Sequence, residues 1–245
     1  MKNKIKFTIV GAGSICFGPQ TITDILLNES FSGLDQIIIY LMDVNQEALD
    51  VSNAFCRRAI DKLRRKNITL ESGTDLARAL SGADFVVTAI EVDRYHYWSM
   101  DFHIPRRYGF RQIYGENGGP GGMFHTLRNL RPMLEIAHTM EKECPEAWLL
   151  NYTNPEAKLV EGITRFSNVK VVGLCHGIGN GLSSAAKLLN MPVERIAVKA
   201  VGLNHFGWLT RIWDKETGED LYPRLKENEK TYLGWLIGMS TLYLA

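Results

Sequence analysis

Short apolar runs alternate with amphipathic stretches along the first part of the chain. The apolar runs suit buried strands and occupy residues 6–10, 37–42, 68–70 and 84–90. The stretches between them have helical periodicity and occupy residues 19–28, 45–66 and 74–80. Strands that alternate with helices are typical of a parallel sheet with helices on both faces. The pattern therefore predicts a Rossmann-like, doubly wound α/β fold.

The alternation is interrupted before it resumes. Residues 93–109 are rich in aromatic, His and Arg side chains, and the glycine-rich residues 115–122 predict a flexible loop with no regular structure. Beyond this loop we predict further helices and strands. The helices are at residues 123–143, 156–166 and 179–190, and the strands are at residues 147–152 and 169–174.

The pattern changes again after residue 192. Residues 195–203 and 206–213 read as strands, and the turn-forming residues 215–218 favour antiparallel pairing there. We place a domain boundary at this change, with residues 1–192 forming the Rossmann-like domain and residues 193–245 beginning a second α/β domain. Residues 232–239 read as an apolar helix that would need a partner surface, so we expect the second domain to be truncated.

Composition excludes several classes of protein. The 245 residues are 45% hydrophobic with a net charge of +1 and no charged tail, so neither nucleic acid nor a membrane surface is an expected partner. No apolar run reaches the roughly 18–20 residues that span a bilayer, and no signal segment precedes the first strand, so we predict a cytoplasmic protein. The four cysteines form no CxxC pair and are expected to be reduced thiols.

A glycine turn follows the first predicted strand. Glycines there let the backbone approach a pyrophosphate, which the next helix N-terminus stabilises. The third glycine falls at Gly18, so the match to the dinucleotide motif is incomplete, and a purely structural turn is the alternative. Asp43 ends the second strand, where a carboxylate binds ribose hydroxyls and favours NAD over NADP. The loop residues predicted to contact NAD are Gly11, Gly13, Ser14 and Ile15.

Cys175 and His176 follow one later strand, and Asn204 and His205 follow another, so one ligand from each strand end could converge. Thiol and imidazole groups are ligands for divalent transition metals, and two such ligands would leave positions for substrate oxygens. The alternatives are a buried cysteine that packs as a small apolar side chain and an ordinary core or surface histidine.

Two further features could bind a polar ligand. The carboxamides of Asn151 and Asn154 end the strand at residues 147–152, where they would either contact a hydroxyl-rich ligand or form a turn that caps the next helix. Arg94 follows the fourth strand, and its guanidinium could bind a carboxylate in bidentate fashion. The other arginines of this region read as a solvated helix face.

Together these residues resemble glycoside hydrolase family 4, the NAD- and metal-dependent glycosidases. The resemblance runs from Lys6 to about Trp208. It rests on the glycine turn at residues 9–14, on Met42-Asp43, and on four later motifs. These are Gly119-Pro120-Gly121-Gly122, Asn151-Tyr152-Thr153-Asn154-Pro155, Gly173-Leu174-Cys175-His176-Gly177 and Gly202-Leu203-Asn204-His205-Phe206-Gly207.

The resemblance implies roles for particular residues. Cys175 and His205 would hold a divalent metal, usually Mn²⁺, and Asn154 would contact the sugar hydroxyls. The implied chemistry is redox-assisted elimination, distinct from two-carboxylate glycoside hydrolysis. NAD oxidises the sugar at C3, the metal assists deprotonation at C2, the leaving group departs from C1, and water then adds.

His176 occupies the position where family members that act on phosphorylated sugars carry an acidic Asp. The Cys-His-Gly sequence resembles the members that act on α-glucuronides or α-galacturonides, which implies a uronic acid substrate and makes Arg94 a candidate for binding its carboxylate. His176 is then a catalytic candidate for proton transfer or specificity. The family's tyrosine base lies downstream, and we expect it beyond residue 245.

Other readings of the chain remain open at this point. The chain could act on a neutral α-galactoside or α-glucoside, be a hydroxy-acid dehydrogenase, or be a truncated chain that binds NAD without catalysis. In the favoured reading its partners are a small-molecule sugar and further copies of itself, as a homo-oligomer.

Overall fold

The computed structural model describes residues 3–14, 17–112, 114–116, 118–203, 206–228 and 242–244. Within these residues, six parallel strands form one sheet in the order β3-β2-β1-β4-β5-β6. This is the strand order of dinucleotide-binding folds, and it reverses between β1 and β4. The predicted Rossmann-like fold is therefore confirmed. The strands are β1 (Lys4–Val10), β2 (Gln36–Met42), β3 (Ile68–Gly73), β4 (Phe85–Thr88), β5 (Trp148–Asn151) and β6 (Lys170–Gly173).

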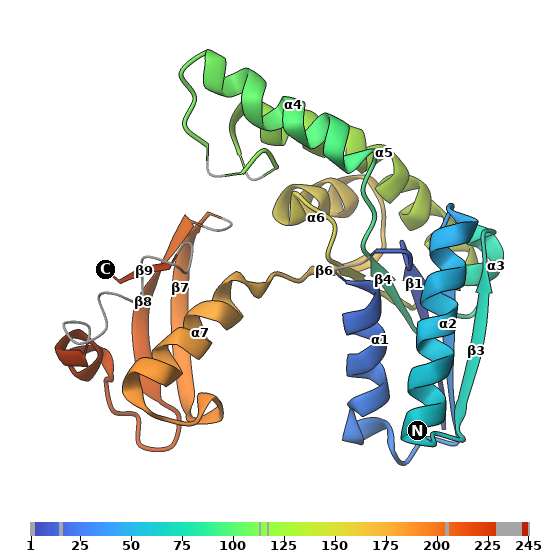
Figure 1. Ribbon diagram of the computed structural model, residues 1–245, viewed down its shortest axis with the longest axis horizontal. Coiled ribbons are helices and arrows are strands. Elements are labelled where there is room, and N and C mark those ends of the chain that lie inside the picture. Colours follow the sequence, from blue (N-terminus) through green and yellow to red (C-terminus); the bar gives the residue numbers. More distant parts are fainter. Residues whose placement is uncertain are drawn as a thin grey trace.

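Helices cover both faces of this sheet, and α1 and α2 lie side by side on one of them (Figure 1). Their core includes Ile22 and Leu26 of α1, Leu49 of α2, and Ile39 and Leu41 of β2. Because both faces are covered, residues 37–42 of β2 are buried without interruption, which explains their continuous apolar run. The helices of this part are α1 (Gly18–Leu27), η1 (Glu29–Phe31), α2 (Gln46–Leu63), α3 (Leu76–Leu80), α4 (Arg94–Arg107), α5 (Gly119–Glu143) and α6 (Glu156–Phe166).

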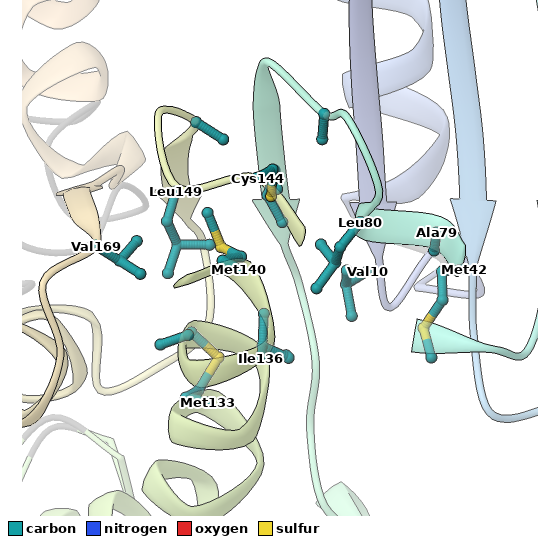
Figure 2. Close-up of a cluster of buried hydrophobic side chains, with 14 of the residues drawn as sticks. Val10, Met42, Ala79, Leu80, Met133, Ile136, Met140, Cys144, Leu149 and Val169 are labelled. Atoms are coloured by element: carbon teal, nitrogen blue, oxygen red, sulfur yellow. The ribbon is translucent and has the colours of Figure 1, made fainter. Parts of the chain in front are cut away.

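The opposite face is packed by α3, α5 and α6. Figure 2 shows Met133, Ile136 and Met140 of α5 close to Leu149 of β5 and Leu80 of α3. These side chains are at most 4% exposed. The long helix α5 therefore anchors its C-terminal half in the core and carries its N-terminal half toward the carboxyl ends of the strands.

Residues 94–107, to which the sequence pattern assigned no bounds, form the regular helix α4. One prediction for the middle of the chain is wrong, because residues 119–122 are the first turn of α5 and not part of a flexible loop. The glycines there serve close packing, because a Cβ on Gly121 would lie 2.1 Å from the carbonyl oxygen of Asp101 in α4. Pro120 is tolerated in this first turn, where no N–H donor is needed.

The C-terminal part has a core of its own. β7 (Ile196–Leu203) and β8 (Phe206–Asp214) are antiparallel, as predicted, and β9 (Leu242–Leu244) pairs with β8 in parallel. Helix α7 (His176–Leu189) packs Ala185 and Leu189 against Ile196 and Ile212 of this sheet. The 3-10 helix η2 (Val193–Arg195) joins α7 to β7. The boundary at residue 192 stays a prediction, and residues 232–239 lie outside the described part of the chain.

A membrane-spanning helix would need a long apolar segment. None of the helices in the described residues is long and apolar enough to cross a bilayer.

Candidate functional site

The loop between β1 and α1 turns tightly beside the end of β2. Gly11 has a left-handed φ of +85°, and the N–H groups of Gly11 and Ala12 both donate to the carbonyl of Met42, at 2.9 and 3.0 Å. A Cβ on Gly11 would lie 2.5 Å from the carbonyl oxygen of Ala89, so a side chain does not fit there. The turn brings the loop to the point where the strand order reverses, which is where this fold binds dinucleotides.

The carboxylate of Asp43 is fixed beside this loop. Its Oδ2 accepts a hydrogen bond from the Gly13 N–H at 2.8 Å, and its Oδ1 accepts one from the Asn45 N–H at 2.9 Å. Each oxygen keeps a second lone pair for a ligand hydroxyl. The glycine at position 13 and the oriented carboxylate therefore fit the ribose of a dinucleotide.

The rest of the loop leads directly into α1. Ser14 Oγ accepts a hydrogen bond from the Phe17 N–H at 3.3 Å. A Cβ on Gly18 would lie 2.5 Å from the carbonyl oxygen of Ala12, so this third glycine lets α1 begin against the loop. A helix N-terminus so placed stabilises a bound phosphate. Ile15 lies outside the described residues, and its contact with NAD stays a prediction.

The two asparagines after β5 have different surroundings. Asn151 is fully buried: its Oδ1 accepts from Thr88 Oγ1 at 3.0 Å and its Nδ2 donates to the Thr153 carbonyl at 3.0 Å. Asn151 therefore forms a turn after β5, which is the alternative to ligand binding that the sequence left open for it. Asn154 is partly exposed, and its backbone carbonyl accepts a hydrogen bond from Asn129 Nδ2 of α5 at 3.0 Å. Asn154 is therefore the asparagine better placed to meet a ligand.

Cys175 caps the N-terminus of α7. Its thiol is exposed, and Sγ accepts from the Gly177 N–H at 3.4 Å. An exposed sulfur does not act as a core side chain, unlike Cys56 and Cys144, whose burial raises the pKa of each thiol to about 11. A thiol at this position suits a divalent transition metal. The predicted second ligand, His205, lies outside the described residues, which themselves contain no metal-binding group of three His, Cys, Asp or Glu side chains.

His176 meets the dinucleotide loop through aromatic contacts. Its ring centroid lies 5.9 Å from that of Phe17 and 6.3 Å from that of Tyr152, and these two rings stack at 5.0 Å. Phe17 precedes α1, Tyr152 follows β5, and His176 begins α7. The three rings therefore bring three separate segments together at the carboxyl edge of the sheet.

Arg94 begins α4 close to the end of β4, and its side chain is 48% exposed. Its guanidinium donates to Glu91 Oε2 at 3.0 Å and lies 3.7 Å from Glu116 Oε1. Glu116 also accepts a hydrogen bond from the indole of Trp98. The positive charge of Arg94 is thus already balanced by local carboxylates, so a substrate carboxylate would have to share or displace them.

A buried charged network lies beneath Arg94. His125 of α5 faces Glu91 Oε1 through Nε2 and Asp101 Oδ2 through Nδ1, both at 3.0 Å. Arg128 forms a bidentate pair with the two oxygens of Asp101 at 2.9 and 3.0 Å. Asn129 Nδ2 donates to Glu91 at 3.2 Å. The network joins the end of β4 to α4 and α5.

Comparison with known proteins identifies the family. Residues 6–191 match the model described as family 4 glycosyl hydrolase, and residues 200–240 match that of the family 4 glycosyl hydrolase C-terminal domain. The chain belongs to glycoside hydrolase family 4. It spans about half the length of the curated relatives that it matches.

These family 4 relatives carry different specificities. An α-glucosidase of Erwinia rhapontici is 37% identical over 97% of this chain and 52% of its own length. An α-galactosidase of Bacillus subtilis is 36% identical over 92% of this chain and 51% of its own. An α-galacturonidase of Thermoanaerobacter italicus is 32% identical over 93% of this chain and 49% of its own. The chain is therefore at least as similar to α-glucosidases and α-galactosidases of the family as to its α-galacturonidases.

A solved structure supports the fold assignment. A 6-phospho-alpha-glucosidase from gut microorganisms, in complex with NAD and Mn²⁺, superposes with a TM-score of 0.82 at 30% identity, covering 93% of this chain and 51% of that one.

Sequence reasoning missed three members of the buried network beside Arg94 in this family 4 protein: Glu91, Asp101 and His125. Glu91 directly follows the strand predicted at residues 84–90 and lies three positions after the end of β4, a place that could have drawn attention to it. His125 and Asp101 gave no such signal, because they are 24 positions apart and meet only when α4 and α5 pack together.

Glu156 is a carboxyl group for which the described part of this family 4 chain shows no ion-pair partner. Glu156 begins α6, and its Oε1 lies only 1.4 Å from where a Cβ on Gly173 would stand, so it rests directly on the end of β6. Burial raises the pKa of Glu156. The position lies next to the segment that leads into Cys175.

Proposed function

We propose that this family 4 member is a glycosidase that hydrolyses α-linked galacturonides or glucuronides with NAD and Mn²⁺ or another divalent metal. The observation that carries the proposal is the meeting of three segments at one sheet edge. The glycine loop follows β1 and Asp43 follows β2, while the Asn154 turn and the Cys175-His176 start of α7 follow β5 and β6.

The bound groups would supply a hydride acceptor and a Lewis acid. The chain's own residues would hold them: the loop glycines leave room for the pyrophosphate, Asp43 binds the ribose, and Cys175 with His205 holds the metal. The NAD- and Mn²⁺-containing relative supports this assignment.

Substrate residues follow from the same arrangement. Asn154 would contact sugar hydroxyls, and His176, adjacent to the proposed metal ligand, would transfer a proton or discriminate between sugars. Arg94 would bind the uronate carboxylate at the rim of the site. The α-galacturonidase relative supports this substrate class.

A neutral α-glucoside or α-galactoside is the second candidate substrate. Arg94 already pairs with Glu91 at 3.0 Å, which favours a ligand that does not need its charge. The α-glucosidase and α-galactosidase relatives point the same way. The hydroxy-acid dehydrogenase reading is set aside, because the family models cover both parts of the chain.

Turnover of matched aryl glycosides tests the proposal. With NAD and Mn²⁺ present, we expect hydrolysis of aryl α-galacturonide or α-glucuronide to exceed that of the neutral aryl α-glycosides. Arg94→Ala should raise KM for the uronide by about tenfold, the effect of losing one charge-assisted hydrogen bond, and leave the neutral substrates unchanged. Arg107→Ala, at the other end of the same helix, is the control.

Two other results would contradict the proposal. If neutral glycosides turn over faster and Arg94→Ala changes no KM, the substrate is a neutral sugar. If the protein binds NAD in calorimetry and hydrolyses none of these glycosides, the chain is a non-catalytic NAD-binding unit.

A further inference from the structure

The imidazole of His125 is enclosed between two carboxylates. Its side chain is 0% exposed, and both of its ring nitrogens lie 3.0 Å from a carboxylate oxygen. The Nδ1 contact with Asp101 has the geometry of a hydrogen bond, while the Nε2 contact with Glu91 is an ion-pair contact without that geometry. A neutral imidazole has one N–H, so it would turn a lone pair toward one carboxylate, whereas the imidazolium turns a positively charged N–H group toward each of the two.

The charges around His125 also require a third cation. Three carboxylates belong to this cluster, Glu91 from the loop after β4, Asp101 from α4 and Glu116 from the loop before α5. Arg94 and Arg128 are the guanidinium partners of these carboxylates. Among the described residues these ion pairs hold three carboxylates and two guanidinium groups, so a positive charge on His125 makes the cluster neutral. Charges that are buried without compensation are strongly unfavourable.

The cluster also connects His125 with the rim of the site. Glu91 uses Oε1 toward His125 and Asn129, and uses Oε2 toward Arg94. The side chain of Glu91 is 18% exposed and that of Arg94 is 48% exposed. His125 therefore acts on the exposed guanidinium through one carboxylate, whose two oxygens face opposite ways.

We propose that His125 is an imidazolium in the folded protein and a positioning residue for Arg94. By fixing Glu91 and offsetting its charge, it keeps the surroundings of Arg94 favourable for an anionic sugar. The expected effect on turnover rests on the proposed uronide substrate. The charge of His125 does not depend on the substrate.

The balance of forces on the ring agrees with this arrangement. Burial alone lowers the pKa of His125, but its contacts with Glu91 and Asp101 outweigh burial and raise the pKa above its ordinary value. For Glu91, burial raises the pKa, and the contacts with His125, Asn129 and Arg94 outweigh it and lower the pKa. The two shifts are consistent with an ion pair.

Proton occupancy can be measured directly. In ¹⁵N-histidine-labelled protein titrated from pH 5 to 9, we expect the His125 ring nitrogens to keep imidazolium chemical shifts well above pH 6.5, the ordinary pKa of an imidazole being about 6.5. His125→Gln assigns the resonances. If the His125 ring becomes neutral at or below about pH 6.5, the ordinary pKa of an imidazole, His125 is not an imidazolium in the folded protein, whatever the substrate is.

Kinetics test the positioning role. His125→Gln should raise KM for an aryl α-uronide by about tenfold, with a smaller effect on kcat, because an uncompensated Glu91 competes for Arg94 and repels the substrate. KM for neutral aryl glycosides should not change. The exposed His138→Gln, also in α5, is the control.

A charge-balanced double variant separates electrostatics from folding. Glu91→Gln together with His125→Gln removes one charge of each sign and should bind galacturonate more tightly than His125→Gln alone, as a calorimetric titration would show. Melting temperature and NAD affinity report whether each variant is folded.

The outcomes distinguish the two proposals. An unchanged uronide KM in a folded His125→Gln variant would overturn the positioning role. If uronides are not substrates at all, the proposed function is wrong. The galacturonate titration then still tests the positioning role of His125, and the proton occupancy still tests its charge.

Discussion

At the scale of single residues, the site divides into parts that the sequence signals and parts that it does not. Gly11, Gly13 and Asp43 could be predicted, because a strand that ends in glycine and a strand that ends in aspartate are local patterns. The His125–Asp101 pair could not, because its chemistry depends on a contact between two helices. Burial of a charged side chain leaves no local signal in composition or periodicity.

Glu156 allows a prediction about stability and pH. Burial raises its pKa in the folded state, so the unfolded chain ionises first, near its ordinary pKa of about 4.3. Stability is therefore lost as the pH rises from that value through the folded pKa. Glu156→Gln should be more stable than the unchanged protein at pH 7, by about 0.5 kcal/mol because the group is only half-buried, and equally stable at pH 4.

Urea unfolding at the two pH values measures this difference in free energy of unfolding. Glu146→Gln is the matched control: its carboxylate is exposed and paired with Lys170, which lowers the pKa of Glu146, so this variant should show no gain at pH 7. The contrary result would be a Glu156→Gln variant that is less stable than the unchanged protein at pH 7 but equally stable at pH 4. It would mean that the ionised carboxylate has a stabilising partner.

At the scale of elements, the strands and most helices were predictable, because their buried faces are apolar. Helix α4 was not, since its buried residues are Asp101 and Pro105, so it has no apolar stripe for periodicity to reveal. The start of α5 was predicted as a loop for a related reason: glycines that permit close helix packing look like glycines that permit flexibility.

The packing of α4 on α5 should be sensitive to one methyl group. Gly121→Ala would place Cβ 2.1 Å from the Asp101 carbonyl oxygen, a backbone atom that cannot move alone. We expect a loss of about 1–3 kcal/mol in the free energy of unfolding, the range for overpacked cores. Gly118→Ala, whose Cβ would meet nothing within 4 Å, should cost less than about 0.5 kcal/mol. Equal effects of the two changes in urea unfolding would contradict this account.

At the scale of the whole molecule, α7 links the two parts of the chain. Figure 1 shows α7 beside the β7–β8 sheet, joined to β6 by the segment before it. The first residue of α7, His176, contacts Phe17 of the dinucleotide loop, and its last residue, Leu189, packs into the core of the β7–β8 sheet. The metal ligand proposed for Cys175 precedes this helix directly. Binding at the sheet edge is therefore coupled by geometry to the C-terminal part, where the proposed ligand His205 lies in sequence.

We propose that one edge of the sheet serves both NAD and a divalent metal in glycoside hydrolysis. The most direct test is the rate of aryl α-galacturonide hydrolysis by protein stripped of nucleotide and metal, measured after adding back NAD, Mn²⁺ or both. We expect hydrolysis only when NAD and Mn²⁺ are both present, and no net formation of NADH. Hydrolysis that survives chelation of the metal, or that proceeds without NAD, would contradict it.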